Sequence, residues 1–268
     1  MKLLKTCIAF LSLTLSANAL ANEPNPLWQQ MNLLQLKMMQ DEGIGFDYDD
    51  YYVNYTRYFD FADDVSFKDV LGSDNELKIL KHKDDIIAHL KQRVDAINPK
   101  TTVMRFYKPR VFFEEFDTDL NAFVDFKPFN SRTGVGSSQK GLTTYSSDPG
   151  FQDDVLGMFV NNDFIKDIPM DIDLATEFLD TLEKDFRGEL ERVADVEVFA
   201  VPSHLAHKKY NVHDNVVMYE IVACRAFGRR GNFRGKELGR KINHEKLAEI
   251  LGNDNKIFKE ETPAELNL

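Results

Sequence analysis

The sequence predicts an α+β protein in which helices pack on a mainly antiparallel sheet. Apolar residues recur at helical spacing in several segments, and other segments alternate apolar and polar residues as a strand with one solvated face does. A short phrase also occurs twice, as FKDVLG at residues 67–72 and as FQDDVLG at residues 151–157. Each copy precedes an acidic helix start and then strand-like segments. We therefore expect a tandem duplication of a helix-then-strands unit, preceded by two N-terminal helices.

Residues 1–21 have the pattern of a signal peptide. Lys2 and Lys5 form a basic start, residues 7–15 are an apolar run, and residues 17–21 supply a small-residue cleavage site. The apolar run is too short to span a bilayer comfortably, and no later segment has the composition of a membrane helix. We expect a soluble protein with no membrane span that is periplasmic or secreted.

The net charge of the chain disfavours some classes of binding partner. The net charge is −11, and loss of Lys2 and Lys5 with the signal peptide would lower it by two, to −13. Such an acidic surface disfavours nucleic acid and anionic membranes. Cys224 is then the one remaining cysteine, so no internal disulfide is expected and the core must supply the stability.

Residues 22–66 are predicted to be helical. Asn25 and Pro26 suit a helix start, and Gly43 suits its end. The helix that follows carries aromatic residues on one face, and the candidate ligand-binding residues among them are Tyr48, Tyr52 and Tyr55. Tyrosine offers an apolar ring and a polar tip, so this face is a candidate platform for a sugar or a peptide. The alternative is a helix that docks the same face on the core.

The first repeat unit is expected at residues 67–132. Its helix carries Ile86, Leu90 and Val94 at helical spacing, and Asn98-Pro99 ends it. Three strands are then predicted, at residues 101–107, 111–116 and 120–126. Residues 133–150 are rich in Gly, Ser and Thr and are expected to form a linker or loop.

The second repeat unit is expected at residues 151–242. Leu174, Phe178, Leu182 and Phe186 predict a helix in this unit. A strand at 196–201 follows, and then the most apolar strand of the chain, 216–227, which we place in the centre of a sheet. Residues 243–268 are expected to form a C-terminal helix, capped by Asn243 and ended by Gly252, and a loose tail.

Two motifs for cofactors are incomplete. Residues 136–141 have the glycine spacing of a phosphate loop, but Leu142 stands where the lysine belongs. Residues 117–125 offer the acids of a calcium loop, but Ala122 replaces the glycine of the turn and Pro128 the closing glutamate. We therefore expect no cofactor and no metal site.

A basic cluster follows the central strand. Its candidate ligand-binding residues are Arg225, Arg229, Arg230 and Arg234. Because the guanidinium fork matches planar anions, the cluster is a candidate site for a carboxylate, a phosphate or an acidic partner. The alternative is a solvated hairpin tip that pairs with acids of the same chain, such as Asp60, Asp63 and Asp64.

These features favour a non-catalytic binding or interaction protein whose partner is an unknown protein or a small anionic ligand. The alternative is an exported hydrolase that uses Glu220, a carboxylate in the middle of the apolar strand, or the histidines His204, His207 and His213. A hydrolase would require those residues to converge in a pocket with a second titratable group.

Overall fold

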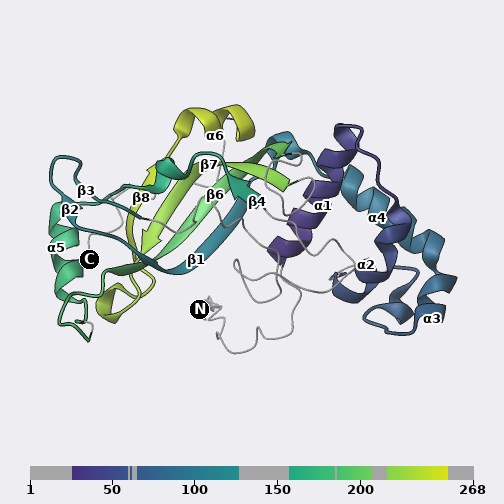
Figure 1. Cartoon of the computed structure of the whole chain (residues 1–268), viewed down its shortest axis with the longest axis horizontal. Helices are drawn as coiled ribbons and strands as arrows, with labels where there is room; N and C mark the ends of the chain where they lie inside the picture. The colour runs from purple at the N-terminus through teal and green to yellow at the C-terminus, as the bar shows by residue number, and fades with distance from the viewer. Residues whose placement is uncertain are drawn as a thin grey trace, which may run out of the picture.

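The computed structural model describes residues 26–59, 61, 65–126, 157–184, 186–206 and 216–252. The molecule is elongated, with a group of helices at one end and a long twisted sheet at the other (Figure 1). The predicted α+β class with mainly antiparallel sheets is confirmed. The expected signal peptide (1–21), the linker (133–150) and the tail (253–268) lie outside the described residues. No described helix has the length and apolar character needed to cross a membrane.

In the described residues, the helical end contains four α-helices and two short 3-10 turns. They are α1 (Pro26–Asp41), η1 (Tyr48–Asp50), α2 (Tyr52–Tyr58), η2 (Lys68–Val70), α3 (Glu76–Lys81) and α4 (Lys83–Asp95). Their side chains enclose a core of their own, in which Tyr55, Phe67, Ile86 and Leu90 are fully or almost fully buried. Asn75 caps α3 by accepting a hydrogen bond from the Lys78 backbone N–H at 3.2 Å.

Helix α1 contributes to two cores. Leu33 and Leu36 point into the helical core. Met31, Leu34 and Met38 belong instead to the larger core beneath the sheet. Figure 1 shows α1 between the sheet and helices α2 to α4. The helix is therefore apolar on more than one side, and it joins the two ends of the molecule.

The large sheet is antiparallel apart from one short strand. Its strands are β1 (Met104–Phe112), β4 (Gly157–Phe159), β6 (Val193–Ala206), β7 (Val216–Phe227) and β8 (Glu237–Ile242). The order is β1-β6-β7-β4, and β8 also pairs with β7. Strand β4 runs parallel to β7. As expected from its apolar residues on both faces, β7 is central and pairs with three neighbours.

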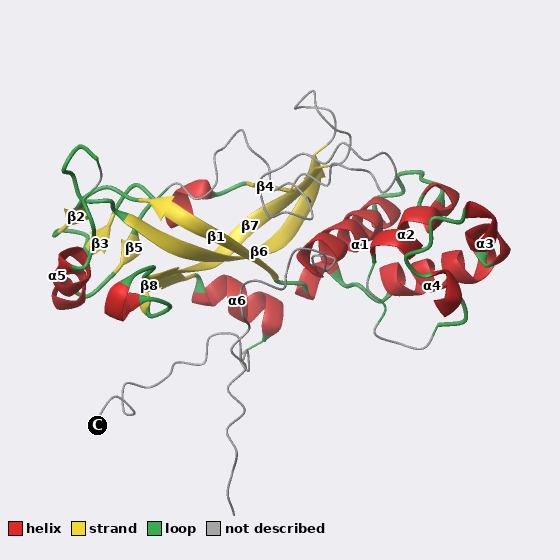
Figure 2. Ribbon diagram, turned by 90° about the horizontal axis from the view of Figure 1, so that it is seen from below, coloured by secondary structure: helices red, strands yellow, loops and turns green. Residues whose placement is uncertain are grey.

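Smaller elements pack against parts of this sheet. A second sheet is formed by β2 (Phe116–Asp117), β3 (Ala122–Phe123) and β5 (Ile168–Pro169), and α5 (Ile172–Asp180) follows it. Helix α6 (His244–Leu251) lies against the opposite face of the large sheet (Figure 2). There Leu247 packs with Phe199, Val201 and Val222.

Three predicted elements are corrected. Most of the two strands expected at 101–107 and 111–116 forms one strand, β1, because Pro109 sits in a β-bulge between Lys108 and Val111 and not in a turn. This strand ends at Phe112, and Phe116 begins β2. The strand expected at 120–126 is reduced to Ala122–Phe123, with both side chains buried. The helix expected to reach Phe186 ends at Asp180, and the side chain of Phe186 is exposed.

The duplication stays a prediction. After the first copy of the repeated phrase the chain forms α3 and α4, whereas Gly157, at the end of the second copy, starts β4, and β5 follows before α5. Val70 is fully buried, but its expected counterpart, Val155, lies outside the described residues. The order of elements after the two copies therefore differs.

Candidate functional site

One face of the large sheet carries a layer of charged side chains. Strand alternation sends Phe106, Val196 and Val198 into the main core and their neighbours to the opposite face. The register aligns Tyr107 with Glu197, and Glu197 with Arg225, across β1, β6 and β7. We call this surface the arginine face. It consists of Arg105, Arg110, Arg225, Arg229, Arg230 and Arg240 with the acids that pair with them.

Glu197 is the buried centre of the arginine face. Its side chain is 2% exposed and accepts hydrogen bonds from the guanidinium groups of Arg105 and Arg225. The Arg225 Nε donates to Oε2 at 2.9 Å. The Arg225 guanidinium also lies 5.5 Å from the centre of the Phe199 ring. A carboxylate in this position needs such partners, because burial without them would be costly.

Asp195 and Glu191 also pair with arginines, near the end of the sheet. Asp195 accepts from the Tyr107 hydroxyl at 2.6 Å and from the Arg110 backbone N–H at 3.0 Å, and the Arg229 Nε lies 2.7 Å away. Glu191 joins Arg110, at 2.6 Å, to Arg230, at 3.1 Å. Burial, followed by the hydrogen bond to Asp195, raises the pKa of Tyr107 to about 12.

Three acids lie beneath the arginines, whereas Glu183, which also pairs with Arg230, has a side chain that is 71% exposed. The side chains of Glu197, Glu191 and Asp195 are 2%, 16% and 18% exposed. Those of Arg105, Arg110 and Arg230 are 67%, 59% and 40% exposed. Each guanidinium has five N–H donors, so one held from below by a carboxylate still has donors that face solvent. The face therefore presents guanidinium groups whose positions are set by buried acids.

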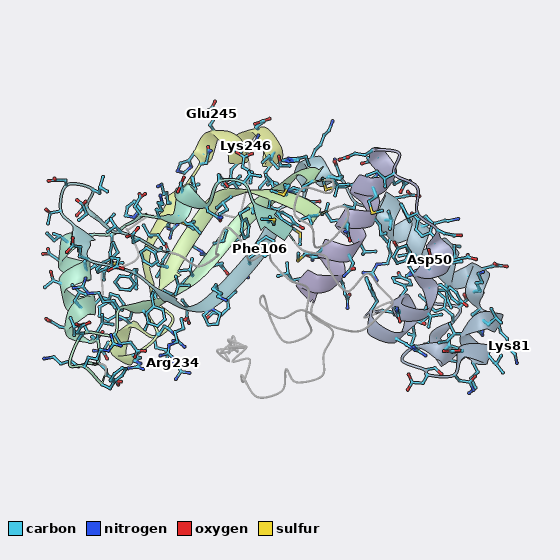
Figure 3. All side chains as sticks on the ribbon, in the orientation of Figure 1. Asp50, Lys81, Phe106, Arg234, Glu245 and Lys246 are labelled. Carbon is cyan, nitrogen blue, oxygen red and sulfur yellow. The ribbon has the colours of Figure 1, made fainter. Side chains whose placement is uncertain are left out.

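The structure brings three of the four predicted arginines onto this face. Arg225, Arg229 and Arg230 take part in the network described above. Arg234 is exposed just after the turn η5 (Gly231–Phe233), far from the helical end in Figure 3, and makes no ion pair with any described residue. The predicted acidic partners Asp60, Asp63 and Asp64 lie outside the described residues.

The true acidic partners were not identified from the sequence. Glu197 lies between Val196 and Val198 in the sequence. A charged residue between two β-branched ones in a strand is the pattern that could have indicated a buried acid with a partner. Asp195 also belongs to β6, and Glu191 comes shortly before it. Because these acids are far from the arginines in sequence, only the strand register reveals that they meet.

The predicted tyrosine platform is corrected at Tyr55. Its side chain is fully buried, its hydroxyl is 2.9 Å from His89 Nδ1, and burial raises its pKa to about 12. Tyr55 therefore belongs to the helical core. Tyr48 and Tyr52 are half-buried, and the Nζ of Lys91 lies 5.2 Å from the centre of the Tyr48 ring. The three tyrosines do not form a common exposed face.

The residues of the hydrolase alternative do not converge within the described part of the chain. Glu220 is half-buried and lies 3.8 Å from Lys246 Nζ. His204 is exposed on β6, with its Nδ1 3.1 Å from the Ser203 hydroxyl, and His207 and His213 lie outside the described residues. Among the residues that are described, no three metal-ligating side chains form a cluster.

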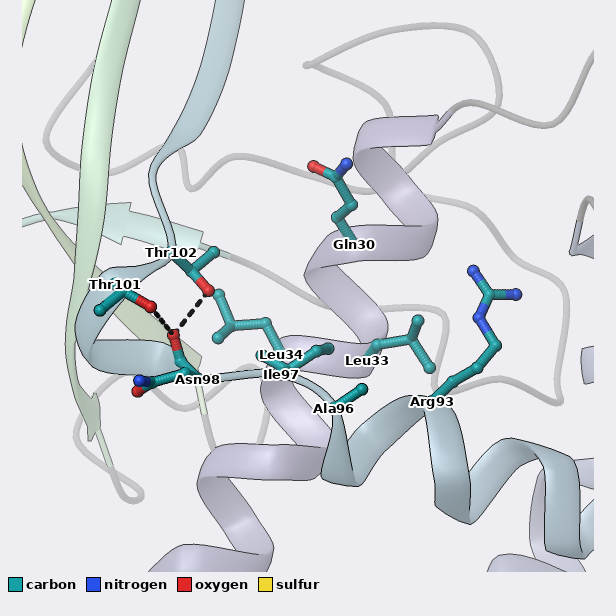
Figure 4. Close-up of a pocket in the computed structure, with 9 residues that line it drawn as sticks. All are labelled: Gln30, Leu33, Leu34, Arg93, Ala96, Ile97, Asn98, Thr101 and Thr102. Carbon is teal, nitrogen blue, oxygen red and sulfur yellow. Dashed lines mark hydrogen bonds between the residues drawn. The ribbon is translucent and has the colours of Figure 1, made fainter. Parts of the chain in front are cut away.

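A groove lies at the joint between the helices and the sheet (Figure 4). It measures about 480 Å³ and is bounded by α1, the end of α4 and the turn η3 (Pro99–Thr101). Leu33, Leu34 and Ile97 give it apolar walls, and Gln30 and Arg93 add polar groups. Its volume is in the range of small-molecule sites. The Arg93 guanidinium, however, lies over the rings of three aromatic residues, which are Tyr55, Phe59 and Phe61.

Comparisons with protein-family models, with curated proteins and with solved structures found no match to this chain. Function is therefore inferred from the geometry of the arginine face and of the cavities.

Proposed function

We propose that this chain is a non-catalytic binding protein, exported to the periplasm or secreted, whose arginine face binds an acidic segment of a partner protein. The observation that carries the proposal is the layering of the face, with the carboxylates of Glu191, Asp195 and Glu197 beneath exposed guanidinium groups. An arginine held by a buried acid loses little side-chain freedom when it binds, which lowers the entropic cost of association.

The extent of the face favours a partner with several carboxylates. The arginines come from β1, β7, β8 and the turn after β7, and they span the sheet from strand to strand. A guanidinium fork binds a carboxylate through two parallel hydrogen bonds, which are among the stronger ones in proteins. The acidic charge of the rest of the chain is screened over about 8 Å at physiological salt, so it does not prevent local contact.

The hydrolase alternative has less support. Glu220 forms an ion pair with Lys246, and neither the groove nor the cavity at the β1 bulge is lined by Glu220 or His204. The carboxylate that is buried in the middle of the sheet is Glu197, and it accepts hydrogen bonds from two arginines, Arg105 and Arg225. A general base must reach a substrate proton, whereas the Glu197 side chain is 2% exposed and is paired with the Arg105 and Arg225 guanidinium groups.

The test is a charge-neutral double variant, Arg105→Gln with Arg230→Gln. The probe is a fluorescent peptide rich in glutamate, and its affinity is measured by fluorescence anisotropy at several salt concentrations. We expect the variant to bind about tenfold more weakly or worse, because it loses two charge-assisted contacts. The wild-type affinity should also fall as salt rises.

The matched control is Lys78→Gln with Lys81→Gln. It removes the same net charge from α3, at the end of the molecule opposite to Arg234 (Figure 3). This control should bind the peptide as the wild type does. If both double variants bind the peptide equally weakly, the overall charge of the protein and not the arginine face explains the effect. A wild-type protein that does not bind the peptide would overturn the proposal.

A further inference from the structure

A second cavity, of about 230 Å³, opens at the bulge of β1. Two cationic side chains line it, Lys108 and Arg110, together with two acidic ones, Glu114 and Asp125. Phe112, whose side chain is exposed, and Val111, which is buried, supply apolar surface. The cavity thus combines positive, negative and apolar groups within a small volume.

The backbone holds these groups in an unusual arrangement. Arg110 and Asp125 both have left-handed backbone conformations, with φ of 54° and 58°. The Arg110 N–H donates to Asp195, and the Glu114 N–H donates to the Val124 carbonyl at 3.0 Å. That second bond places Glu114 beside the residue that precedes Asp125. Non-glycine residues in this conformation concentrate at ligand sites, where the surrounding structure enforces them.

Lys108 is the cation of this cavity that pairs with no acid among the described residues. It is half-buried at the edge of the sheet and forms no ion pair with any residue in the described part of the chain. Burial lowers its pKa from the ordinary lysine value. Arg110, in contrast, is held by Glu191 at 2.6 Å. An ammonium that has lost water gains most from a carboxylate that approaches it.

We propose that this cavity binds a free α-amino acid with an apolar side chain. Its carboxylate would pair with Lys108 and Arg110, its ammonium with Glu114 and Asp125, and its side chain would lie on Phe112. The acids would repel a phosphate or a simple dicarboxylate. The volume is below the roughly 300–1,000 Å³ typical of sites for larger ligands, which favours a small metabolite over a peptide.

The test compares three probes by isothermal titration calorimetry on the whole protein. L-leucine has both charges, 4-methylpentanoate keeps the carboxylate alone, and 3-methylbutylamine keeps the ammonium alone. We expect L-leucine to bind at least about tenfold more tightly than either analogue, because each of them leaves charged groups of the cavity unmatched. Equal affinity for L-leucine and 4-methylpentanoate, or no binding of L-leucine, would overturn the proposal.

Variants locate the site. Lys108→Met and Glu114→Gln should each weaken L-leucine binding about tenfold or more. The exposed residues Lys100 and Glu115, which do not line the cavity, supply the matched controls Lys100→Met and Glu115→Gln, and both should bind like the wild type. Binding that survives both cavity variants would contradict the assignment. Arg105 and Arg230 do not line the cavity, so their double variant should still bind L-leucine. The peptide assay and the L-leucine assay therefore test the arginine face and the cavity separately.

Discussion

At the scale of single residues, the central observation is that the arginines of this protein are organised by acids. A surface arginine is usually mobile, and its ion pairs contribute little to stability. Glu197 changes this for Arg105 and Arg225, because a buried carboxylate cannot exchange its partners for water. The same carboxylate therefore serves the fold and positions the proposed binding surface.

Glu197→Gln should destabilise the protein by about 1–3 kcal/mol. The amide keeps the size of the side chain, but it loses the charge that Arg105 and Arg225 require. Arg105→Gln should cost less, about 0–1 kcal/mol, because Arg105 is largely exposed and Glu197 keeps Arg225. Urea unfolding measures both values. The exposed Glu177 on α5 supplies the control Glu177→Gln, and equal values for all three variants would contradict the buried role of Glu197.

At the scale of elements, β8 of the large sheet and β5 of the small sheet approach each other closely at Gly239. A Cβ atom built on Gly239 of β8 would lie 2.1 Å from the Pro169 carbonyl oxygen of β5. The contact involves backbone on both sides, so no side-chain rotation can relieve it. The small sheet with α5 is thereby held against the edge of the large sheet.

Gly239→Ala should therefore destabilise the protein by about 1–3 kcal/mol or more, because β8 and β5 must move apart. Thermal unfolding followed by circular dichroism is the measurement. Gly45→Ala is the control, since a Cβ at Gly45 meets nothing within 4 Å and its backbone is not left-handed. A Gly239→Ala protein as stable as the control would show that the two sheets do not depend on this approach.

At the scale of the whole molecule, α1 contributes apolar side chains to two cores. Its residues Leu33 and Leu36 belong to the helical core, and Met31 and Leu34 to the core under the sheet. Neither core can lose α1 without exposing apolar surface. The elongated shape in Figure 1 therefore does not imply two independent units.

Met31→Ala and Leu36→Ala should each cost about 2–5 kcal/mol, because each leaves a cavity in a fully packed core. Both should also preserve a single unfolding transition. Denaturant titrations followed by near-ultraviolet and by far-ultraviolet circular dichroism should coincide. A variant in which the two signals separate would show that the helical end and the sheet unfold independently.

The sequence predicted the parts of this fold that depend on local pattern. The helix over 86–94, the central place of β7 and the caps Asn243 and Gly252 follow from periodicity and capping chemistry. The prediction of two strands separated at Pro109 was wrong, because a proline is compatible with a β-bulge as well as with a turn. The pairing of Arg225 with Glu197 was not predictable from the sequence. It depends on the register of β6 and β7 and on the bulges in that register, and the local sequence pattern reveals neither of them. The burial of Tyr55 against α4 agrees with the alternative that the sequence left open, a helix that docks its aromatic face on the core.

The bulge in β1 has a consequence for how molecules of this protein meet one another. Within the described residues β1 pairs only with β6, so its other side is an open edge of the sheet. A flat edge strand can recruit a strand from another molecule and begin aggregation. Pro109 has no N–H to offer, and the bulge interrupts the regular spacing of donors and acceptors between Lys108 and Val111. We therefore expect the distortion that shapes the cavity also to hinder the pairing of this edge with a strand of another molecule.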